Sequence, residues 1–175
     1  DAAVRRLEEA IQALRASIDT LIDDDGLGSG EHRELLQTHR LPAPDRAALT
    51  YGVFASLVEE TAEALRSRGF ARNDKLAIVL PNGPDMAAAF VTVACAVTAA
   101  PLNPAYREDE FHFYMDDLKA RALLVEEGST SPAIAVARKL GIAVAELVVP
   151  PGAAAGRFEL RGTPGKAARP GDDPV

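Results

Sequence analysis

The first 22 residues have the most regular spacing of apolar positions in the chain. Aliphatic residues recur there at intervals of three and four, Val or Ile alternating with Leu: Val4, Leu7, Ile11, Leu14, Ile18 and Leu21. This heptad spacing predicts an amphipathic helix and favours a parallel two-stranded coiled coil, and hence a homodimer. Packing of the helix on its own domain, or docking to another protein, are the alternatives. We expect a helical leader over 1–25 and a flexible, glycine-rich linker over 26–30.

From residue 31 onward, short apolar runs alternate with longer segments of helical periodicity. The apolar runs predict strands at 75–80, 99–102, 122–125 and 143–149, and the segments around them predict helices at 51–68, 84–98, 108–118 and 131–140. Thr50 is placed to cap the first helix, while Gly69 and Gly141 are placed to end two of them. The alternation predicts an α/β fold over 31–149, with a doubly wound, mainly parallel sheet flanked by helices.

The last part of the chain has a different composition. Glycine, proline, alanine and arginine dominate from residue 150 onward, and 158–160 is the only strand-like patch. We therefore expect 150–175 to form an irregular connector.

Composition and charge narrow the function classes. The 175 residues carry a net charge of −7 without a dense basic run, which excludes nucleic acid as a main partner. The single cysteine, Cys95, excludes an intramolecular disulfide and favours a reducing, cytoplasmic location. The longest apolar run, 86–102, is short for a membrane span and contains Pro101 near its end. No secretory signal is visible, and the chain begins with Asp1 instead of Met, so we expect a piece of a longer protein.

The ionisable residues do not form a recognisable catalytic constellation. The three histidines, His32, His39 and His112, fall in or near predicted helices, and nothing in the sequence places one beside a nucleophile. Cys95 lies within an apolar helix, which predicts a buried and inert thiol. Residues 108–110 are three consecutive acids, which cannot all face one point and are typical of a helix N-terminus. We assign no catalytic and no metal-binding residue.

Two turns and one glycine-rich string are candidates for ligand binding. Residues 162–166 (GTPGK) fail the phosphate-loop pattern, because the required glycine and hydroxyl positions hold Leu160 and Ala167. Ligands of doubly wound folds bind beyond the carboxyl ends of the strands, where we expect the turns 81–83 and 103–106. Each turn is also explained by ordinary turn chemistry.

Several strings in one order resemble a known family. They are LTYG at 49–52, KLAIVLPNGPDM at 75–86, AAPLNPAYREDEF at 99–111 and ARALLV at 120–125. Together they resemble the N-terminal subdomain of the AMP-forming acyl-CoA synthetases and adenylate-forming ligases, over about residues 31–175. The sequence LNPAYREDEF at 102–111 is most similar to that of the fatty-acid, coumarate and oxalate CoA-ligase branch.

The resemblance implies a two-step reaction for the intact enzyme. A carboxylate attacks the α-phosphorus of ATP to give an acyl-adenylate and pyrophosphate, and a thiol, usually coenzyme A, then displaces AMP. Mg²⁺ and cationic groups offset the charge at phosphorus. ATP, Mg²⁺ and coenzyme A are thus the implied cofactors, and we expect none of them to bind tightly to this chain alone.

This chain also departs from the family pattern. The phosphate loop, the adenine-binding strand, the ribose-binding Asp and the lid with its catalytic Lys have no counterpart in the 175 residues, so no catalytic role transfers to any position. We expect a catalytically incomplete N-terminal portion, whose partner is the remainder of the synthetase or another subunit. The alternatives are a non-catalytic interaction module that dimerises through the leader, and an unrelated nucleotide-binding α/β domain.

The helix predicted at 84–98 is apolar on nearly every side, including Phe90, Val91 and Val97. A helix of this kind needs cover on every side. One face can rest on the chain's own sheet, and we expect the other to be covered by the missing half or by another chain.

Overall fold

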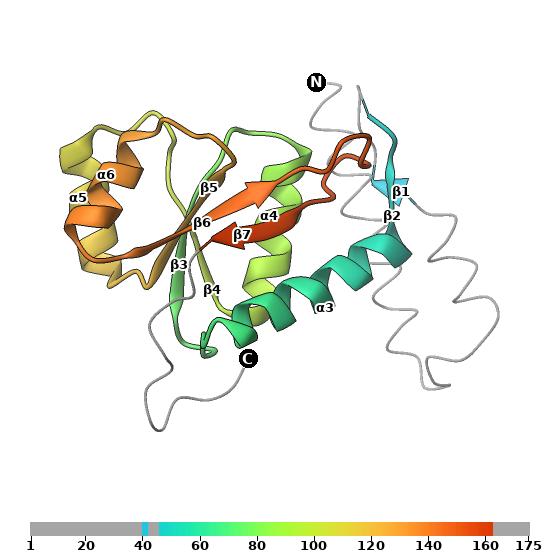
Figure 1. The fold of residues 1–175 in the computed structure, drawn as a ribbon, viewed down its shortest axis with the longest axis horizontal. Coiled ribbons are helices and arrows are strands. Elements are labelled where there is room, and N and C mark those ends of the chain that lie inside the picture. The colour runs from blue at the N-terminus through green and yellow to red at the C-terminus, as the bar shows by residue number, and fades with distance from the viewer. Residues whose placement is uncertain (1–39, 42–45, 163–175) are drawn as a thin grey trace, which may run out of the picture.

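The computed structural model describes residues 40–41 and 46–162, which form a five-stranded sheet with two helices on each face and a separate two-stranded ribbon (Figure 1). The elements in chain order are β1 (Arg40–Leu41), β2 (Leu49–Thr50), α3 (Tyr51–Ser67), β3 (Lys75–Val79), α4 (Pro84–Ala96), β4 (Thr98–Pro101), α5 (Glu108–Leu118), β5 (Ala122–Glu126), α6 (Pro132–Lys139), β6 (Ala143–Val148) and β7 (Glu159–Gly162).

The main sheet has the strand order β4-β3-β5-β6-β7. The first four strands are parallel neighbours, and β7 joins β6 antiparallel at the far edge. Because β3, β5 and β6 run in one direction, their carboxyl ends meet at one edge of the sheet. The predicted α/β class with a mainly parallel sheet is confirmed.

Local capping chemistry explains why the predicted helices form where they do. The Thr50 hydroxyl accepts a hydrogen bond from the Val53 amide at 3.3 Å and starts α3. Gly69 and Gly141 follow α3 and α6 in the left-handed region, with φ of 77° and 67°. The helix predicted over 84–98 ends earlier, at Ala96, because the Val97 backbone is already extended.

Alternation along the strands divides the apolar side chains between two cores. Leu76 and Ile78 of β3 pack with α3 and α4 on one face. Ala77 and Val79 of the same strand pack with α5 and α6 on the other. Both faces of the sheet are therefore covered, as its continuously apolar strands require.

The expected irregular connector from residue 150 needs a correction. Residues 159–162 form β7, and Phe158 just before it is 1% exposed and belongs to the core between the sheet and α3. Ala155 is buried as well. The strand-like patch at 158–160 was visible in the sequence, but the unpaired edge of β6 that it joins was not. Residues 163–175 lie outside the described part.

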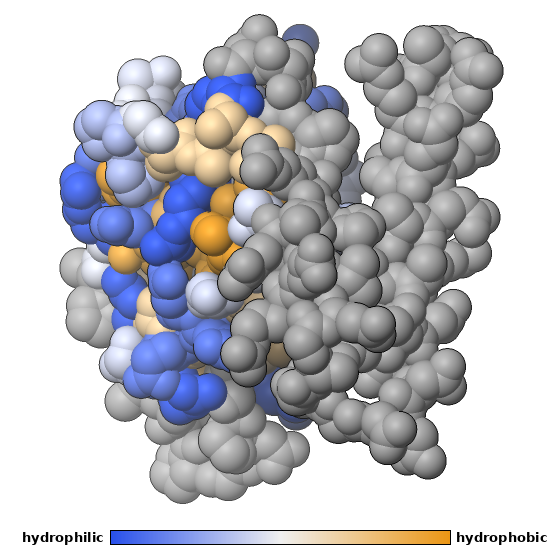
Figure 2. All heavy atoms as spheres, turned by 90° about the vertical axis from the view of Figure 1, so that its right-hand side faces the viewer, coloured by the Kyte–Doolittle hydropathy of each residue, from blue (hydrophilic) through white to orange (hydrophobic). Residues whose placement is uncertain are grey.

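The predicted leader and linker also lie outside the described residues. This applies to the heptad positions from Val4 to Leu21, to His32 and to His39, so the coiled coil stays a prediction. Within the described part, no helix combines the length and apolar content that crossing a bilayer requires. The face of the molecule shown in Figure 2 is mostly hydrophilic where it is coloured, with a cluster of hydrophobic residues among the polar ones.

Candidate functional site

A cavity of about 380 Å³ opens at the edge where the parallel strands end. Its walls come from the turn after β3, the first turn of α4, the end of β5 and the end of β6. The lining residues are Leu80, Pro81, Asn82, Gly83, Pro84, Asp85, Met86, Glu126, Glu127, Leu147 and Val149. The turn at 81–83, predicted as a ligand-binding rim, thus lines a cavity at the expected edge.

The turn is positioned by a contact between residues far apart in the sequence. Asp85, in the first turn of α4, accepts hydrogen bonds through one oxygen from the Arg46 guanidinium at 2.5 Å and from the Gly156 amide at 2.9 Å. Gly156 has φ of 88°, and a Cβ atom there would lie 3.2 Å from that of Ala88. This contact fixes the segment before β2 and the loop before β7 against the start of α4.

The charge of the cavity limits what it can bind. Asp85, Glu126 and Glu127 contribute carboxylates to its walls, and no Lys or Arg is among its lining residues in the described ranges. Glu127 pairs with Arg161 of β7 at 2.5 Å, which neutralises part of this charge. A triphosphate needs cationic partners. The cavity alone therefore does not fit one.

The second predicted rim, at 103–106, does not line this cavity. Asn103 accepts a hydrogen bond from the Ala105 amide at 3.0 Å, which is an Asx turn. The Tyr106 ring stacks on Tyr114, with centroids 5.1 Å apart, and meets Phe111 edge-on. The hydrogen bond with Tyr114, followed by burial, raises the pKa of Tyr106 above its ordinary value. Turn and packing chemistry explain this segment.

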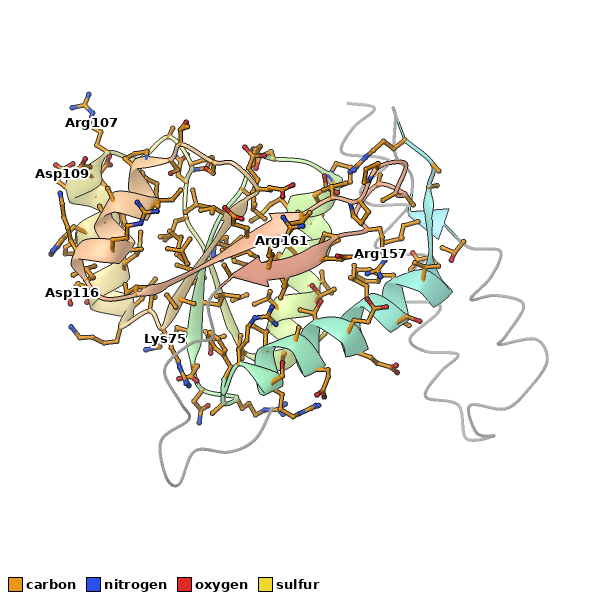
Figure 3. All side chains as sticks on the ribbon, viewed as in Figure 1. Lys75, Arg107, Asp109, Asp116, Arg157 and Arg161 are labelled. Atoms are coloured by element: carbon orange, nitrogen blue, oxygen red, sulfur yellow. The ribbon has the colours of Figure 1, made fainter. Side chains whose placement is uncertain are left out.

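The acids at the start of α5 have separate partners. Glu108 pairs with Lys139 at 3.0 Å, and Glu110 accepts from the Arg107 amide at 2.9 Å, which completes a capping box. Figure 3 shows Arg107, Asp109 and Asp116 at the outer side of α5, pointing away from the sheet. Among the described residues, no group of His, Cys, Asp or Glu could hold a metal ion.

The prediction that Cys95 is buried was wrong. Its thiol is exposed, because Cys95 falls on the side of α4 that turns away from the sheet. A helix that is apolar all round gives no hint of which side faces the core. His112 is also exposed, next to the buried Phe111. Sequence reasoning missed the contact of Arg46, Asp85 and Gly156, since no local pattern joins residues 39 and 71 positions apart.

Comparison with known proteins identifies related sequences. A family profile described as AMP-binding enzyme matches residues 31–169. An oxalate–CoA ligase from Arabidopsis thaliana is 36% identical over 118 residues, covering 62% of this chain and 23% of the ligase. A probable CoA ligase from Humulus lupulus is 32% identical over 105 residues, covering 59% of this chain and 20% of that protein. The chain thus spans less than a quarter of the length of these two relatives.

Solved structures share the fold. A benzoate CoA ligase from Burkholderia xenovorans LB400 superposes with a TM-score of 0.57 at 16% identity, over 65% of this chain and 24% of that one. Apo MatB from Rhodopseudomonas palustris superposes with a TM-score of 0.51 at 19% identity, over 62% of this chain and 22% of that one. At these identities the likeness concerns the fold alone.

Proposed function

This chain belongs to the AMP-binding enzyme family, and we propose that it forms the N-terminal part of an AMP-forming acid–thiol ligase. In the proposed reaction a carboxylate oxygen attacks the α-phosphorus of ATP and pyrophosphate leaves. A thiol sulfur then attacks the acyl carbonyl, loses its proton, and AMP leaves. The observation that carries the proposal is the family match over 31–169, supported by the CoA ligases that share 36% and 32% of their aligned residues with this chain.

ATP, Mg²⁺ and coenzyme A are the cofactors proposed for the intact enzyme. The described residues do not fit the triphosphate, because the cavity at the strand ends has carboxylates and no cation in its lining. We therefore assign no step of the reaction to these residues. Their contribution is architectural: the contact of Asp85 with Arg46 and Gly156 fixes the turn at the edge of the sheet.

A second, non-catalytic role accounts for one observation as well as the catalytic proposal does. Phe90 and Val91 of α4 are 41% and 42% exposed and lie next to each other on a side of the helix that has no charged residue. In this role the chain is an interaction module in the cytoplasm. Its partners are the remainder of a synthetase or another subunit, and residues 1–22 associate with a second copy or dock on another apolar surface.

A chimera tests the catalytic proposal. The segment of the Arabidopsis oxalate–CoA ligase that aligns with this chain is replaced by the corresponding residues of this chain, and pyrophosphate release is measured with ATP and oxalate. The expected result is oxalate-dependent release by the chimera and none by the 175-residue chain alone. Lys139→Gln in the chimera is the matched surface control and should leave release unchanged.

Two outcomes would contradict the proposal. A chimera that folds, as judged by a cooperative thermal transition, but releases no pyrophosphate would show that this chain does not supply a competent N-terminal part. Turnover by the 175-residue chain alone would show that the catalytic groups lie within it.

A further inference from the structure

Two segments that are far apart in the sequence meet at the start of α4. We call residues 46–49, which lead into β2, the entry segment, and residues 150–158, which lead into β7, the exit segment. The Ala155 amide donates a hydrogen bond to the Ala47 carbonyl at 2.9 Å, so the two segments contact each other directly. Figure 1 shows the loop before β7 beside β2. The chain that leads into β2 and the chain that leads into β7 therefore share one place in the fold.

A single carboxylate oxygen holds both segments to α4. Oδ1 of Asp85 accepts a hydrogen bond from the Arg46 guanidinium of the entry segment at 2.5 Å and one from the Gly156 amide of the exit segment at 2.9 Å. Because one oxygen serves both donors, a shift of either segment changes the position of the acceptor that the other segment uses.

Packing at Gly156 links the same two segments sterically. Gly156 has φ of 88°, a conformation that residues with a side chain rarely adopt. A Cβ atom there would lie 3.2 Å from Cβ of Ala88 and 3.6 Å from Cδ2 of Leu49. Ala88 and Leu49 are 3% and 1% exposed. The exit segment is thus part of the cover over α4 and over the entry segment, and it cannot lift off without uncovering both.

Neither segment has slack between this junction and the strand that follows it. Arg46 lies three residues before the first residue of β2, and Gly156 lies three residues before the first residue of β7. Three residues span at most about 10 Å. Phe158, within the second of these spans, is 1% exposed in the core between the sheet and α3. Since β1 pairs with β2, a displacement at the junction reaches β1 and β2 on one side and β7 on the other.

We propose that the entry and exit segments form one coupling element, which docks on α4 and opens as a unit. A constraint on the chain before β1, such as a bound partner, then changes how firmly β7 is held. A constraint on the chain after β7 acts on β1 and β2 in return, because coupling between two sites is reciprocal. Local opening of folded proteins occurs in cooperative units of this kind. The contacts lie within the described residues, and the coupling does not depend on the proposed catalytic function.

Hydrogen exchange followed by mass spectrometry tests the coupling in the 175-residue chain. Arg46→Gln changes the entry segment and leaves Gly156 its acceptor. Exchange should nevertheless become about threefold faster in 155–162 as well as in 46–50, the ratio expected for the loss of a partly exposed ion pair. Lys139→Gln, which removes a surface cation of α6, is the matched control and should leave exchange in both segments unchanged.

Gly156→Ala perturbs the junction from the exit side. The positive φ and the contacts with Ala88 and Leu49 make the added methyl group unfavourable, so exchange in 46–50 should become about tenfold faster. Gly141→Ala adds the same methyl group after α6 at φ of 67°, where no atom beyond its chain neighbours lies within 4 Å. This control should leave exchange in 46–50 unchanged.

Three results would overturn the proposal. Faster exchange only in the segment that carries the substitution would show that the two segments open independently. Unchanged exchange in both segments would show that the junction does not limit their opening. An equal rise over 108–118 of α5 would show that the whole domain opens and that no separate unit exists.

Discussion

Helices α4 and α5 pack on opposite faces of the same sheet and differ most on the sides that they do not bury. Both press apolar residues inward: Val93 of α4 and Phe111 and Met115 of α5 are all 0% exposed. On its outer side α5 carries the acids Glu108, Asp109, Asp116 and Asp117 together with the exposed Phe113 and Tyr114, whereas the exposed residues of α4 include no charged side chain. The inner residues hold each helix to the sheet, and the outer residues indicate what each helix meets next.

The exposed sides of α5 and α4 therefore suit different surroundings. The acids of α5 are well hydrated, and Glu108 keeps a surface pairing with Lys139. Such charges keep a surface in water and oppose association. The exposed side of α4, with Ala87, Phe90, Val91, Ala94 and Cys95, has no charge, so it favours contact with another apolar surface. Under the proposed function, the remainder of the synthetase meets the α4 side of the sheet.

The largest expected effect on stability comes from Phe111, a buried residue of α5. Phe111 is 0% exposed, so Phe111→Ala should lower the free energy of unfolding by about 3–5 kcal/mol. Phe90 on α4 is 41% exposed, and Phe90→Ala should cost about 1 kcal/mol. Urea unfolding followed by circular dichroism compares the two variants. Equal losses would mean that Phe90 is held as firmly as a core residue.

An intermediate effect is expected at the first turn of α4. Asp85→Ala leaves the Arg46 guanidinium and the Gly156 amide without their shared acceptor, which should cost about 1–3 kcal/mol. Asp109→Ala removes a first-turn acid from α5 at an exposed position and should stay within about 0.5 kcal/mol of the unmodified chain. Thermal unfolding of both variants is the measurement. A neutral Asp85→Ala would show that the contact does not hold the loop before β7.

The smallest expected effect concerns the tyrosines beside α5. Since the hydrogen bond with Tyr114 raises the pKa of Tyr106 in the folded chain, the folded state holds this proton more tightly than the unfolded state. The stabilisation is therefore complete below the ordinary tyrosine pKa and is lost as the pH rises through the raised value. In an ultraviolet titration of the folded protein, Tyr106→Phe should remove the part of the tyrosine transition at highest pH. An unchanged transition would contradict the assignment.

The sequence predicted the positions of helices and strands better than the tertiary contacts around them. Residues 108–118 formed the predicted helix, and Thr50 capped α3, because both depend on neighbours along the chain. The burial of Cys95 was predicted wrongly, and the strand-like patch at 158–160 was left within an irregular connector. The exposed side of an all-apolar helix and the free edge of β6 are decided by distant packing.

The candidate site, too, was predicted only where it depends on neighbours along the chain. The turn at 81–83 was predicted from its place after an apolar strand. The other walls of the cavity were not predicted, because they depend on the strand order β3-β5-β6. This order places the ends of the three strands side by side and brings Glu126, Glu127 and Leu147 to the cavity. The contact of Asp85 with Gly156 was beyond prediction for the same reason.

Thiol reactivity on the two outer faces is the most direct test of the contrast between α4 and α5. Cys95 reports on α4 in the unmodified chain, and His112→Cys in a Cys95→Ala background reports on an exposed position of α5. Each alkylation rate is divided by the rate of the same variant in denaturant, which removes differences between the thiols themselves. Cys95 is exposed in the structure. If another apolar surface meets the exposed side of α4 in solution, Cys95 should react several-fold more slowly than the thiol introduced on α5. Equal normalised rates would show that both faces are open to solvent and would contradict the assignment of α4 as the interaction side.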